Sequence, residues 1–500
     1  MNHAKKAANW HAAAAALKPR TQAFIHGEYR DAVSGETFDC VNPADGRTIA
    51  RVASCAAADV DAAVASARRS FEAGDWSNES PAGRKRILRR FSELLLANVE
   101  ELALTETLDM GKPISDALAI DVPGAARSIE WYAEAIDKVY DEVAPTSRST
   151  LAMITREPVG VVGAIVPWNF PLLMACWKLG PALATGNSVV LKPSEKSPLT
   201  AIRVAQLAVE AGLPPGVLNV VPGFGHTAGE ALALHMDVDC VAFTGSTRIG
   251  KRMLEYSGRS NMKRVWLECG GKSPNVVFGD VEDLDRAATA AAYGIFFNQG
   301  EMCSAASRLV VHESVKEALL EKIVAVGRSM APGDPLDPAT RLGALVDKGQ
   351  LDTVTGYIEA GRSQGATLRA GGRRVREETG GFFVEPTVFD NVRMEMKIAQ
   401  EEIFGPVLSV ISFREEAEAI RIANDVMYGL VSAVWTRDIT TAHRVARAIR
   451  AGTVYVNCYD ADDITVPFGG FKQSGNGRDK SLHAMDKYTE LKTTWIDLSN

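Results

Sequence analysis

A cysteine and a glutamate, 35 residues apart, are the side chains best suited to covalent chemistry in this sequence. Cys303 ends the run FFNQGEMC, and Glu268 lies in LECGGK. A thiolate attacks carbonyl carbon, and a carboxylate can activate the water that releases an acyl group. The pair therefore suggests a site that forms a thioester and hydrolyses it. Because a cysteine in an apolar setting is often an inert core residue, the pair has to be judged with its neighbours.

A second motif, GSTRIGKR at 245–252, resembles a phosphate-binding P-loop up to its last position. There Arg252 stands where a Ser or Thr hydroxyl would bind magnesium, so we exclude an NTPase. The segment follows a predicted strand that ends at Thr244, and Ser246 or Thr247 can cap the helix that comes next. The free N–H groups at such a helix start favour an anion, for example a dinucleotide pyrophosphate. A plain strand-to-helix turn is the alternative.

Two more polar motifs follow predicted strands. Lys192 and Glu195 come after the strand at 188–191, where a parallel sheet presents its ligand crevice, and they could hold ribose hydroxyls. Glu195 would repel the extra phosphate of NADP, which favours NAD. Asn169 lies between two prolines after the strand at 159–166, and its amide could donate to an oxyanion. Taken alone, each motif also fits a solvated loop or a turn.

The elements that must position these residues follow from the pattern of apolar residues. Short apolar runs alternate with helical stretches, which predicts βαβ units and parallel sheets. The predicted strands are 159–166, 188–191, 217–221 and 240–244, and in a second block 275–278, 308–311, 407–411 and 453–457; the predicted helices are 57–75, 81–110, 198–211 and 227–234. The segment 488–498 is extended and needs a partner strand, which suggests oligomerisation through a sheet edge.

Composition excludes several classes of protein. The chain has 500 residues, which predicts two or three domains. Its net charge of −7 argues against nucleic-acid binding. Seven scattered cysteines without a CxxC pair indicate reduced thiols in a cytoplasmic setting and no structural zinc, and we expect no metal and no membrane span. The Ala-rich, basic stretch 1–20 faintly resembles a transit peptide, but a helical arm is the preferred interpretation.

Taken together, the motifs resemble the NAD(P)-dependent aldehyde dehydrogenase superfamily. The matching stretches are PWNFP, LKPSE, FTGSTRIG, LECGGKSPN, FFNQGEMC, EEIFGP and PFGGFKQSG, in that order along the chain. The resemblance implies an α/β fold with a Rossmann-type cofactor domain (1–134 and 158–268), an α/β catalytic domain (269–466) and a small oligomerisation β-sheet (135–157 and 480–500). It also implies NAD as cofactor, with NADP weaker, and a homotetramer built as a dimer of dimers.

The resemblance assigns a role to each matching residue. Cys303 would be the nucleophile, Glu268 the general base, and Asn169 the side chain that holds the oxyanion with the backbone N–H of Cys303. Cofactor contacts would come from Trp168, Lys192, Glu195, Gly225, Gly245, Ser246, Gly250, Glu402 and Phe404, although the glycine run around Gly225 does not have the spacing of a dinucleotide fingerprint.

One departure from the family pattern lies two residues before the nucleophile. Glu301 stands where the family usually has Gln, and a carboxylate near the sulfur would raise the pKa of the thiol, so we predict that Glu301 points away from Cys303. The presence of Glu268 favours hydrolysis of the thioester over its transfer to CoA.

The acidic run at 458–464 falls where the family lines its substrate entrance. Asp460 and Asp462, with Asp463, could attract a cationic tail, Trp177 would form an aromatic wall, and Asp121 is a further candidate anchor. The run resembles the bacterial subgroup that oxidises γ-glutamyl-γ-aminobutyraldehyde, 4-guanidinobutyraldehyde and related polyamine-derived aldehydes. The alternatives are a solvated acidic loop on a broad-specificity aliphatic or betaine-type dehydrogenase, or a non-catalytic NAD-binding scaffold.

Overall fold

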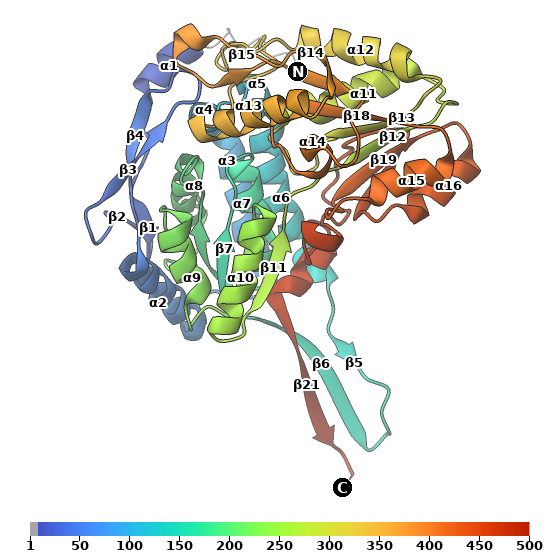
Figure 1. Ribbon diagram of the computed structural model, residues 1–500. Coiled ribbons are helices and arrows are strands. Elements are labelled where there is room, and N and C mark those ends of the chain that lie inside the picture. Colours follow the sequence, from blue (N-terminus) through green and yellow to red (C-terminus); the bar gives the residue numbers. More distant parts are fainter. Residues whose placement is uncertain (1–8, 500) are drawn as a thin grey trace, which may run out of the picture.

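The computed structural model describes residues 9–499, and two seven-stranded sheets form its body (Figure 1). The first sheet has the strand order β11-β10-β7-β8-β9-β1-β2. Its strands are β1 (Ala23–Ile25), β2 (Glu28–Arg30), β7 (Val161–Ile165), β8 (Ser188–Lys192), β9 (Leu218–Val220), β10 (Cys240–Thr244) and β11 (Arg264–Glu268). Strands β7 to β11 are parallel, and β1 and β2 continue the sheet antiparallel.

The order of the first sheet reverses between β7 and β10. The chain runs outward from β7 through β8 to β9 and then returns to the other side of β7 for β10 and β11. In open α/β sheets, ligands bind at the carboxyl ends of the strands beside such a switch point. The motifs at Asn169, Lys192, Gly245 and Glu268 all stand at or just after the carboxyl ends of these strands.

Successive residues of a strand point to opposite faces of the sheet, and in the first sheet both sets are apolar. Helices therefore cover both of its faces. Val161 packs with α2 (Ala57–Ala73), α9 (Glu230–Leu234) and α10 (Thr247–Arg259), whereas the next residue, Val162, packs with helices on the opposite face. Those helices are α3 (Pro81–Ala97), α4 (Val99–Met110), α6 (Val122–Ala135), α7 (Pro171–Ala184) and α8 (Leu199–Glu210). The single helix predicted over 81–110 is broken at Asn98, whose side chain donates to the Leu94 carbonyl at 2.8 Å.

The second sheet has the order β14-β17-β18-β13-β12-β19-β20, with β14 antiparallel to the rest. Its strands are β12 (Pro274–Val277), β13 (Arg308–His312), β14 (Thr367–Ala370), β17 (Thr387–Asp390), β18 (Val407–Phe413), β19 (Val431–Trp435) and β20 (Thr453–Val456). Helices α11 (Leu284–Phe296) and α12 (Lys316–Ser329) pack on one face, and α13 (Lys348–Ser363), α15 (Glu416–Asn424) and α16 (Ile439–Ala448) on the other.

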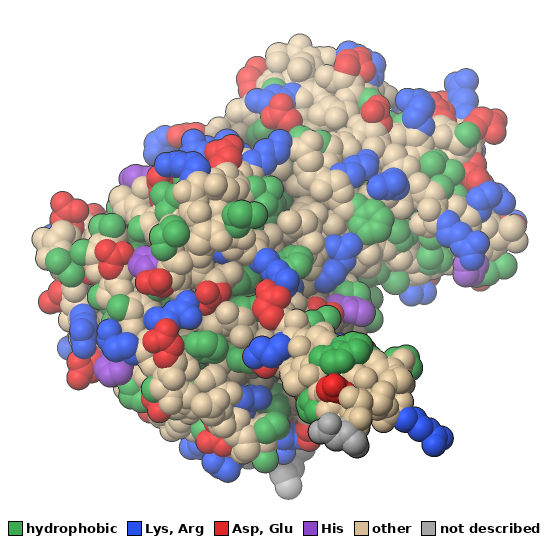
Figure 2. Space-filling model, turned by 90° about the horizontal axis from the view of Figure 1, so that it is seen from below, with side chains coloured by type: hydrophobic (Ala, Val, Ile, Leu, Met, Phe, Trp, Pro, Cys, Tyr) green, Lys and Arg blue, Asp and Glu red, His purple; other side chains and the backbone are tan. Residues whose placement is uncertain are grey.

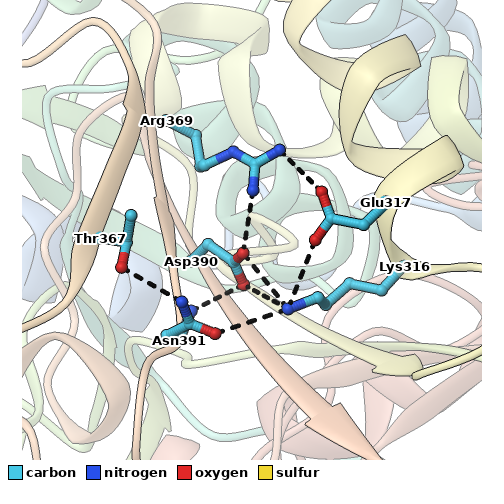
Figure 3. A network of polar contacts seen from close by, with 6 residues as sticks. All are labelled: Lys316, Glu317, Thr367, Arg369, Asp390 and Asn391. Atoms are coloured by element: carbon cyan, nitrogen blue, oxygen red, sulfur yellow. Dashed lines mark hydrogen bonds and ion pairs between the residues drawn. The ribbon is translucent and has the colours of Figure 1, made fainter.

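A polar network fastens α12 to the edge of this second sheet (Figure 3). The Lys316 ammonium lies 3.3 Å from the Asp390 carboxylate, and Arg369 bridges Glu317 at 2.8 Å and Asp390 at 3.3 Å. The network joins α12, β14 and β17 and takes no part in lining the cavity described below.

A third, antiparallel sheet extends away from the body (Figure 1). Strand β21 (Thr489–Asp497) pairs along its length with β6 (Thr150–Pro158), and β5 (Glu142–Val143) pairs with the other side of β6. The extended segment predicted at 488–498 therefore finds its partner strand within the same chain. The outer edge of β21 bonds to no other strand of residues 9–499, so it remains available to a second copy.

The remaining α-helices and strands are short. They are α1 (Trp10–Ala16), α5 (Ile114–Asp116), α14 (Lys397–Gln400), the hairpin β3 (Thr37–Val41) with β4 (Thr48–Ala53), and β15 (Arg374–Val375) with β16 (Phe383–Val384). The predicted N-terminal helix is present as α1, and residues 1–8 lie outside the described part of the chain. Within residues 9–499 no helix combines the length and apolarity needed to cross a bilayer. Basic and acidic side chains intermix over the face shown in Figure 2.

Candidate active site

One cavity of about 330 Å³ opens where the carboxyl ends of β7, β10 and β11 meet loops of the second sheet. All three predicted catalytic residues line it. The other predicted residues that line it are Trp168, Trp177, Gly245, Ser246, Glu402, Phe404, Asp460 and Asp462.

Cys303 follows a tight turn whose backbone is held in an unusual conformation. Asn298 (φ 48°) and Gln299 (φ 59°) both lie in the left-handed region, which is costly for residues with a side chain. The Asn298 amide donates to the backbone carbonyls of Asn169 at 3.2 Å and of Glu301 at 3.1 Å. The turn and the Asn169 loop therefore hold each other in place around the half-buried sulfur.

The environment of Cys303 keeps its thiol protonated at rest. Burial raises its pKa, and the carboxylates of Glu402, Glu268 and Asp460 raise it further. A proton acceptor is therefore needed before the sulfur can attack a carbonyl carbon.

Asn169 is oriented by one of its two amide hydrogens. The side-chain nitrogen donates to the Glu301 carbonyl at 2.8 Å, and no second acceptor for it is present within residues 9–499. The remaining N–H is therefore available to an oxyanion in the cavity that both Asn169 and Cys303 line.

Glu301 points away from Cys303, as predicted. Its carboxylate is buried outside the cavity and accepts a hydrogen bond from the Val346 backbone N–H at 3.0 Å. Burial raises the pKa of Glu301 well above its usual range, so the charged form of this carboxyl group is disfavoured and opposes formation of the thiolate less.

Glu268 ends β11 and is buried without a hydrogen-bond partner for either carboxylate oxygen in the described part of the chain. Burial raises its pKa well above the usual range, the Asp479 carboxylate raises it further, and nearby cations, chiefly Lys178 and Lys487, act in the opposite sense. A Cβ atom on Gly469 would lie 2.8 Å from Glu268 Oε1, so the glycine leaves space for this side chain. An unbonded, buried carboxylate of raised pKa is suited to accepting a proton.

The charged group behind Glu268 was missed in the sequence. Asp479 is buried between the ammonium groups of Lys178 and Lys487 and forms ion pairs with both. The signal that could have found it is Lys178 itself, a lone lysine in the apolar helix α7.

The cavity continues from the sulfur to the start of α10. The Ser246 hydroxyl accepts from the Ile249 N–H at 3.4 Å, which caps this 13-residue helix. Thr244 also lines the cavity, and its buried hydroxyl has no partner in residues 9–499. An open helix N-terminus beside unused polar groups fits the phosphates of a dinucleotide.

Glu402 approaches the chain after β11 so closely that only glycine fits there. Its carboxylate accepts from the Gly271 N–H at 3.0 Å, and a Cβ atom on Gly270 would lie 1.9 Å from the other oxygen. Burial raises the pKa of Glu402 to about 7 against the opposing effects of that N–H and of Lys272. The glycine at position 270 in LECGGK therefore makes room for the Glu402 side chain, which lies more than 130 positions further along the chain.

Comparison with known proteins agrees with this geometry. The aldehyde dehydrogenase family model matches residues 29–494. The chain belongs to the aldehyde dehydrogenase family. It is 56% identical over 491 residues to the NADP/NAD-dependent aldehyde dehydrogenase PuuC of Escherichia coli, and the aligned region covers 98% of each chain.

Among the solved structures that are similar over nearly the whole chain, two carry named activities of interest. An indole-3-acetaldehyde dehydrogenase with NAD⁺ is 64% identical with a TM-score of 0.97, covering 98% of this chain and 99% of its own. The γ-glutamyl-γ-aminobutyraldehyde dehydrogenase of Burkholderia cenocepacia is 62% identical, with the same TM-score and coverage. The protein is therefore an NAD(P)-dependent aldehyde dehydrogenase.

Four predicted contacts of the dehydrogenase lie outside the cavity. The Lys192 ammonium lies 3.2 Å from a carboxylate oxygen of Glu195 at the carboxyl end of β8. This is the same edge of the first sheet at which the cavity opens. Gly225 begins a turn at 225–229, where an added Cβ would meet open space. At Gly250 a Cβ would lie 2.8 Å from the Cys269 sulfur, so this glycine allows α10 to pack closely on the chain that follows β11.

Asp121 does not face the substrate, and its prediction as an anchor was wrong. Its side chain is fully buried and forms an ion pair with Lys112, which also lies 3.5 Å from Glu106. A carboxylate already paired in the core cannot receive a cationic tail.

Aromatic rings and one carboxylate shape the substrate end. Trp177 meets Phe468 edge to face at 5.5 Å. Asp460 accepts from the hydroxyl of Ser304, the residue after the nucleophile, at 3.5 Å. Burial, with Asp462 nearby, raises the pKa of Asp460 to about 6, so its carboxylate is ionised at neutral pH. No group of three or more residues suited to holding a metal ion occurs among residues 9–499.

Proposed function

We propose that this dehydrogenase oxidises aldehydes whose tail carries an ammonium or guanidinium group, such as ω-amino, guanidino or γ-glutamylamino aldehydes. The observation that carries the proposal is the Asp460 carboxylate, which lines the cavity beside aromatic rings and adjoins the nucleophile. Carboxylates and aromatic faces are the groups that bind organic cations. The similarity to a γ-glutamyl-γ-aminobutyraldehyde dehydrogenase supports the same substrate class.

In the proposed mechanism, Glu268 accepts the Cys303 proton and the thiolate adds to the aldehyde carbon. The resulting oxyanion is held by the free amide N–H of Asn169 and the backbone N–H of Cys303. NAD(P)⁺, when bound, supplies the hydride acceptor that turns this adduct into a thioester. Glu268 releases that first proton to solvent and then takes a proton from water, whose oxygen attacks the thioester. The carboxylic acid leaves, and the departing Cys303 thiolate takes the second proton back from Glu268.

Glu268 has to be ionised for both of its proposed steps. Its raised pKa makes it a strong base once deprotonated, and Lys178 and Lys487 keep the ionised form accessible. The lack of hydrogen bonds to its oxygens leaves both free for a water or thiol proton.

For the cofactor we propose contacts from residues along the crevice of the first sheet. Ser246, Gly245 and the helix start would hold the pyrophosphate, Lys192 and Glu195 the adenosine ribose, and Glu402 the nicotinamide ribose. Phe404 meets Trp168 edge to face at 5.1 Å, and this pair would wall the nicotinamide side. Glu195 would repel the 2′-phosphate of NADP, so we expect NAD to be preferred.

We propose separate roles for the regions that carry the three sheets. We infer that 1–134 with 158–268 binds the cofactor, that 269–466 carries the nucleophile, and that 135–157 with 480–500 joins subunits. The exposed edge strand β21 supports assembly into a homotetramer, and we expect a cytoplasmic enzyme.

A second candidate substrate class is a neutral aromatic aldehyde. The indole-3-acetaldehyde dehydrogenase is as similar to this chain as the aminoaldehyde enzyme, and the aromatic wall around Trp177 would suit a flat ring.

The test is kcat/KM for NADH formation from a panel of aldehydes. 4-Guanidinobutyraldehyde and its γ-glutamyl relative are compared with neutral alkyl and indolyl aldehydes of similar length, and NADP⁺ serves as the cofactor control. A preference above about tenfold for cationic tails, equivalent to roughly 1.4 kcal/mol of transition-state binding, supports the proposal. A flat profile, or a preference for the indolyl aldehyde, contradicts it.

A further inference from the structure

We propose that Lys480 sets the charge selectivity of the entrance by holding Asp462 in an ion pair, which leaves Asp460 as the carboxylate that receives a substrate's cation. The inference rests on the proposed function and deepens it. It assigns different roles to two aspartates that the sequence places side by side as equivalent candidates.

Lys480 places a buried ammonium group beside the entrance. Its side chain is 2% exposed and its ammonium forms an ion pair with Asp462, whose side chain is 66% exposed. The ammonium also lies over the Trp177 ring, 5.5 Å from its centre. Trp177 and Asp462 line the cavity, whereas Lys480 does not. The Lys480 ammonium therefore contacts these two side chains from the side that faces away from the cavity.

The backbone around Lys480 is fixed against the entrance segment on both sides. Lys480 (φ 62°) and Ser481 (φ 51°) lie in the left-handed region, which persists only where the surroundings hold it. The Ser481 N–H donates to the Ile464 carbonyl at 2.7 Å, and Asp479 exchanges two backbone hydrogen bonds of 2.7 Å with Phe468. The position of the ammonium is therefore built into the fold.

The other two carboxylates of the segment are in different situations. Asp463 does not line the cavity and accepts from the Thr465 N–H at 2.8 Å. Asp460 has no lysine or arginine in ion-pair contact within residues 9–499, and its carboxylate is bonded by the Ser304 hydroxyl. Lys480 cancels the charge of Asp462, so among the carboxylates of this segment that line the cavity Asp460 is the one without an ion pair in residues 9–499.

The first test replaces Lys480 with methionine, which keeps an apolar side chain against Trp177. The measured quantity is the ratio of kcat/KM for 4-guanidinobutyraldehyde to that for a neutral alkyl aldehyde of equal length. Release of Asp462 should raise this ratio roughly three- to fivefold, the effect of one solvent-exposed ion pair. A ratio unchanged from that of the parent enzyme overturns the proposal.

The second test removes the ion pair as a unit. In Lys480→Met with Asp462→Asn the net charge is that of the parent, so the ratio should return to within about twofold of the parent value. A fall to the level of Asp460→Asn would instead make Asp462 the ligand of the tail and overturn the proposal. Asp462→Asn alone is unsuitable because it leaves a buried ammonium unpaired. If Lys480→Met alone fails to fold, the double variant still decides.

Asp463→Asn is the matched control, since it removes a neighbouring charge and keeps the cap on Thr465. Its ratio should equal that of the parent, and a loss as large as that of Asp460→Asn overturns the assignment. A flat substrate profile of the parent contradicts the proposed function and the role of Asp460 as the cation's partner, but not the neutralisation of Asp462 by Lys480. Lys480→Met should then create a preference for cations that the parent lacks.

Discussion

Glu268 at the nucleophile end of the cavity and Asp462 at its entrance are held in opposite ways. At the nucleophile end Glu268 has no hydrogen bond to either oxygen, and burial raises its pKa. At the entrance Asp462 is paired with Lys480 and exposed to solvent. The difference separates groups that can exchange a proton from groups that hold a charge in place. A buried carboxylate without a partner has a raised pKa and can exchange a proton, whereas a carboxylate in an ion pair stays ionised and does not take part in proton transfer.

The largest effect is expected from Cys303→Ala. Loss of the nucleophile should lower NADH formation by about 10⁴-fold or more, because no other group can form the thioester. NAD⁺ binding, measured by quenching of tryptophan fluorescence, should remain. Appreciable turnover in this variant would exclude Cys303 as the attacking group.

Glu268→Gln should slow the steady-state rate by about 10²- to 10⁴-fold, the range of general base catalysis. Because hydrolysis is blocked after the oxidation step, mass spectrometry should find the acyl group on Cys303 after mixing with aldehyde and NAD⁺. In the parent enzyme the base has to be deprotonated, so its rate should rise with pH through the raised pKa of Glu268. A normal rate with the same pH profile would remove Glu268 from this role.

Asn169→Ala tests the oxyanion contact. Loss of one donor should reduce kcat by about 10²-fold while KM changes little, because the contact strengthens in the transition state. Asn169→Asp is the size-matched comparison, and its carboxylate should be at least as harmful. An effect confined to KM would contradict the assignment.

The entrance should show a smaller effect that depends on pH. Burial and Asp462 raise the pKa of Asp460 to about 6, so its carboxylate is ionised above that pH and neutral below it. The preference for cationic over neutral aldehydes should therefore be full at pH 8 and decline by up to about tenfold as the pH falls through 6. Asp460→Asn should show a preference independent of pH. A declining ratio in that variant would assign the titration to another group.

Asp121→Asn should have almost no effect on turnover, which tests the correction made for this residue. It removes one partner of the fully buried Lys112, so the free energy of unfolding should fall by about 3 kcal/mol, the low end of the range because Glu106 stays close to the ammonium. Thermal unfolding measures the loss, and the aldehyde panel provides the activity control. A selective loss of activity toward cationic aldehydes would restore the original prediction.

The parts that could be predicted from the sequence are those specified by local pattern. The alternation of apolar runs and helices predicted both parallel sheets, and β10 has the predicted bounds of 240–244. The strands β1 and β2 at one end of the first sheet were missed because each has three residues and β1 pairs with the distant β9, and the hairpin β3–β4 was missed as well. The strand β19 was also missed, although its run VSAVW is apolar and rich in valine.

For the site, motifs predicted which residues meet but not how their charges are balanced. Cys303, Glu268 and Asn169 lie in recognisable runs, and the cavity brings them together. The pairing of Lys480 with Asp462 depends on a left-handed backbone and on packing against Trp177, neither of which has a signature in spacing. Asp121 failed for the same reason, since its distance from the cavity is set by tertiary packing.

The protonated resting thiol of Cys303 also determines how the enzyme withstands oxidants. Peroxides and alkylating agents react with thiolates, and the thiol form of a buried cysteine is largely inert to them. The adjacent Met302 and Ser304 provide no second thiol that could recover a sulfenic acid as a disulfide. Burial and the nearby carboxylates, which raise the pKa of the sulfur, therefore protect it from oxidation between turnovers, and they slow its ionisation when an aldehyde arrives.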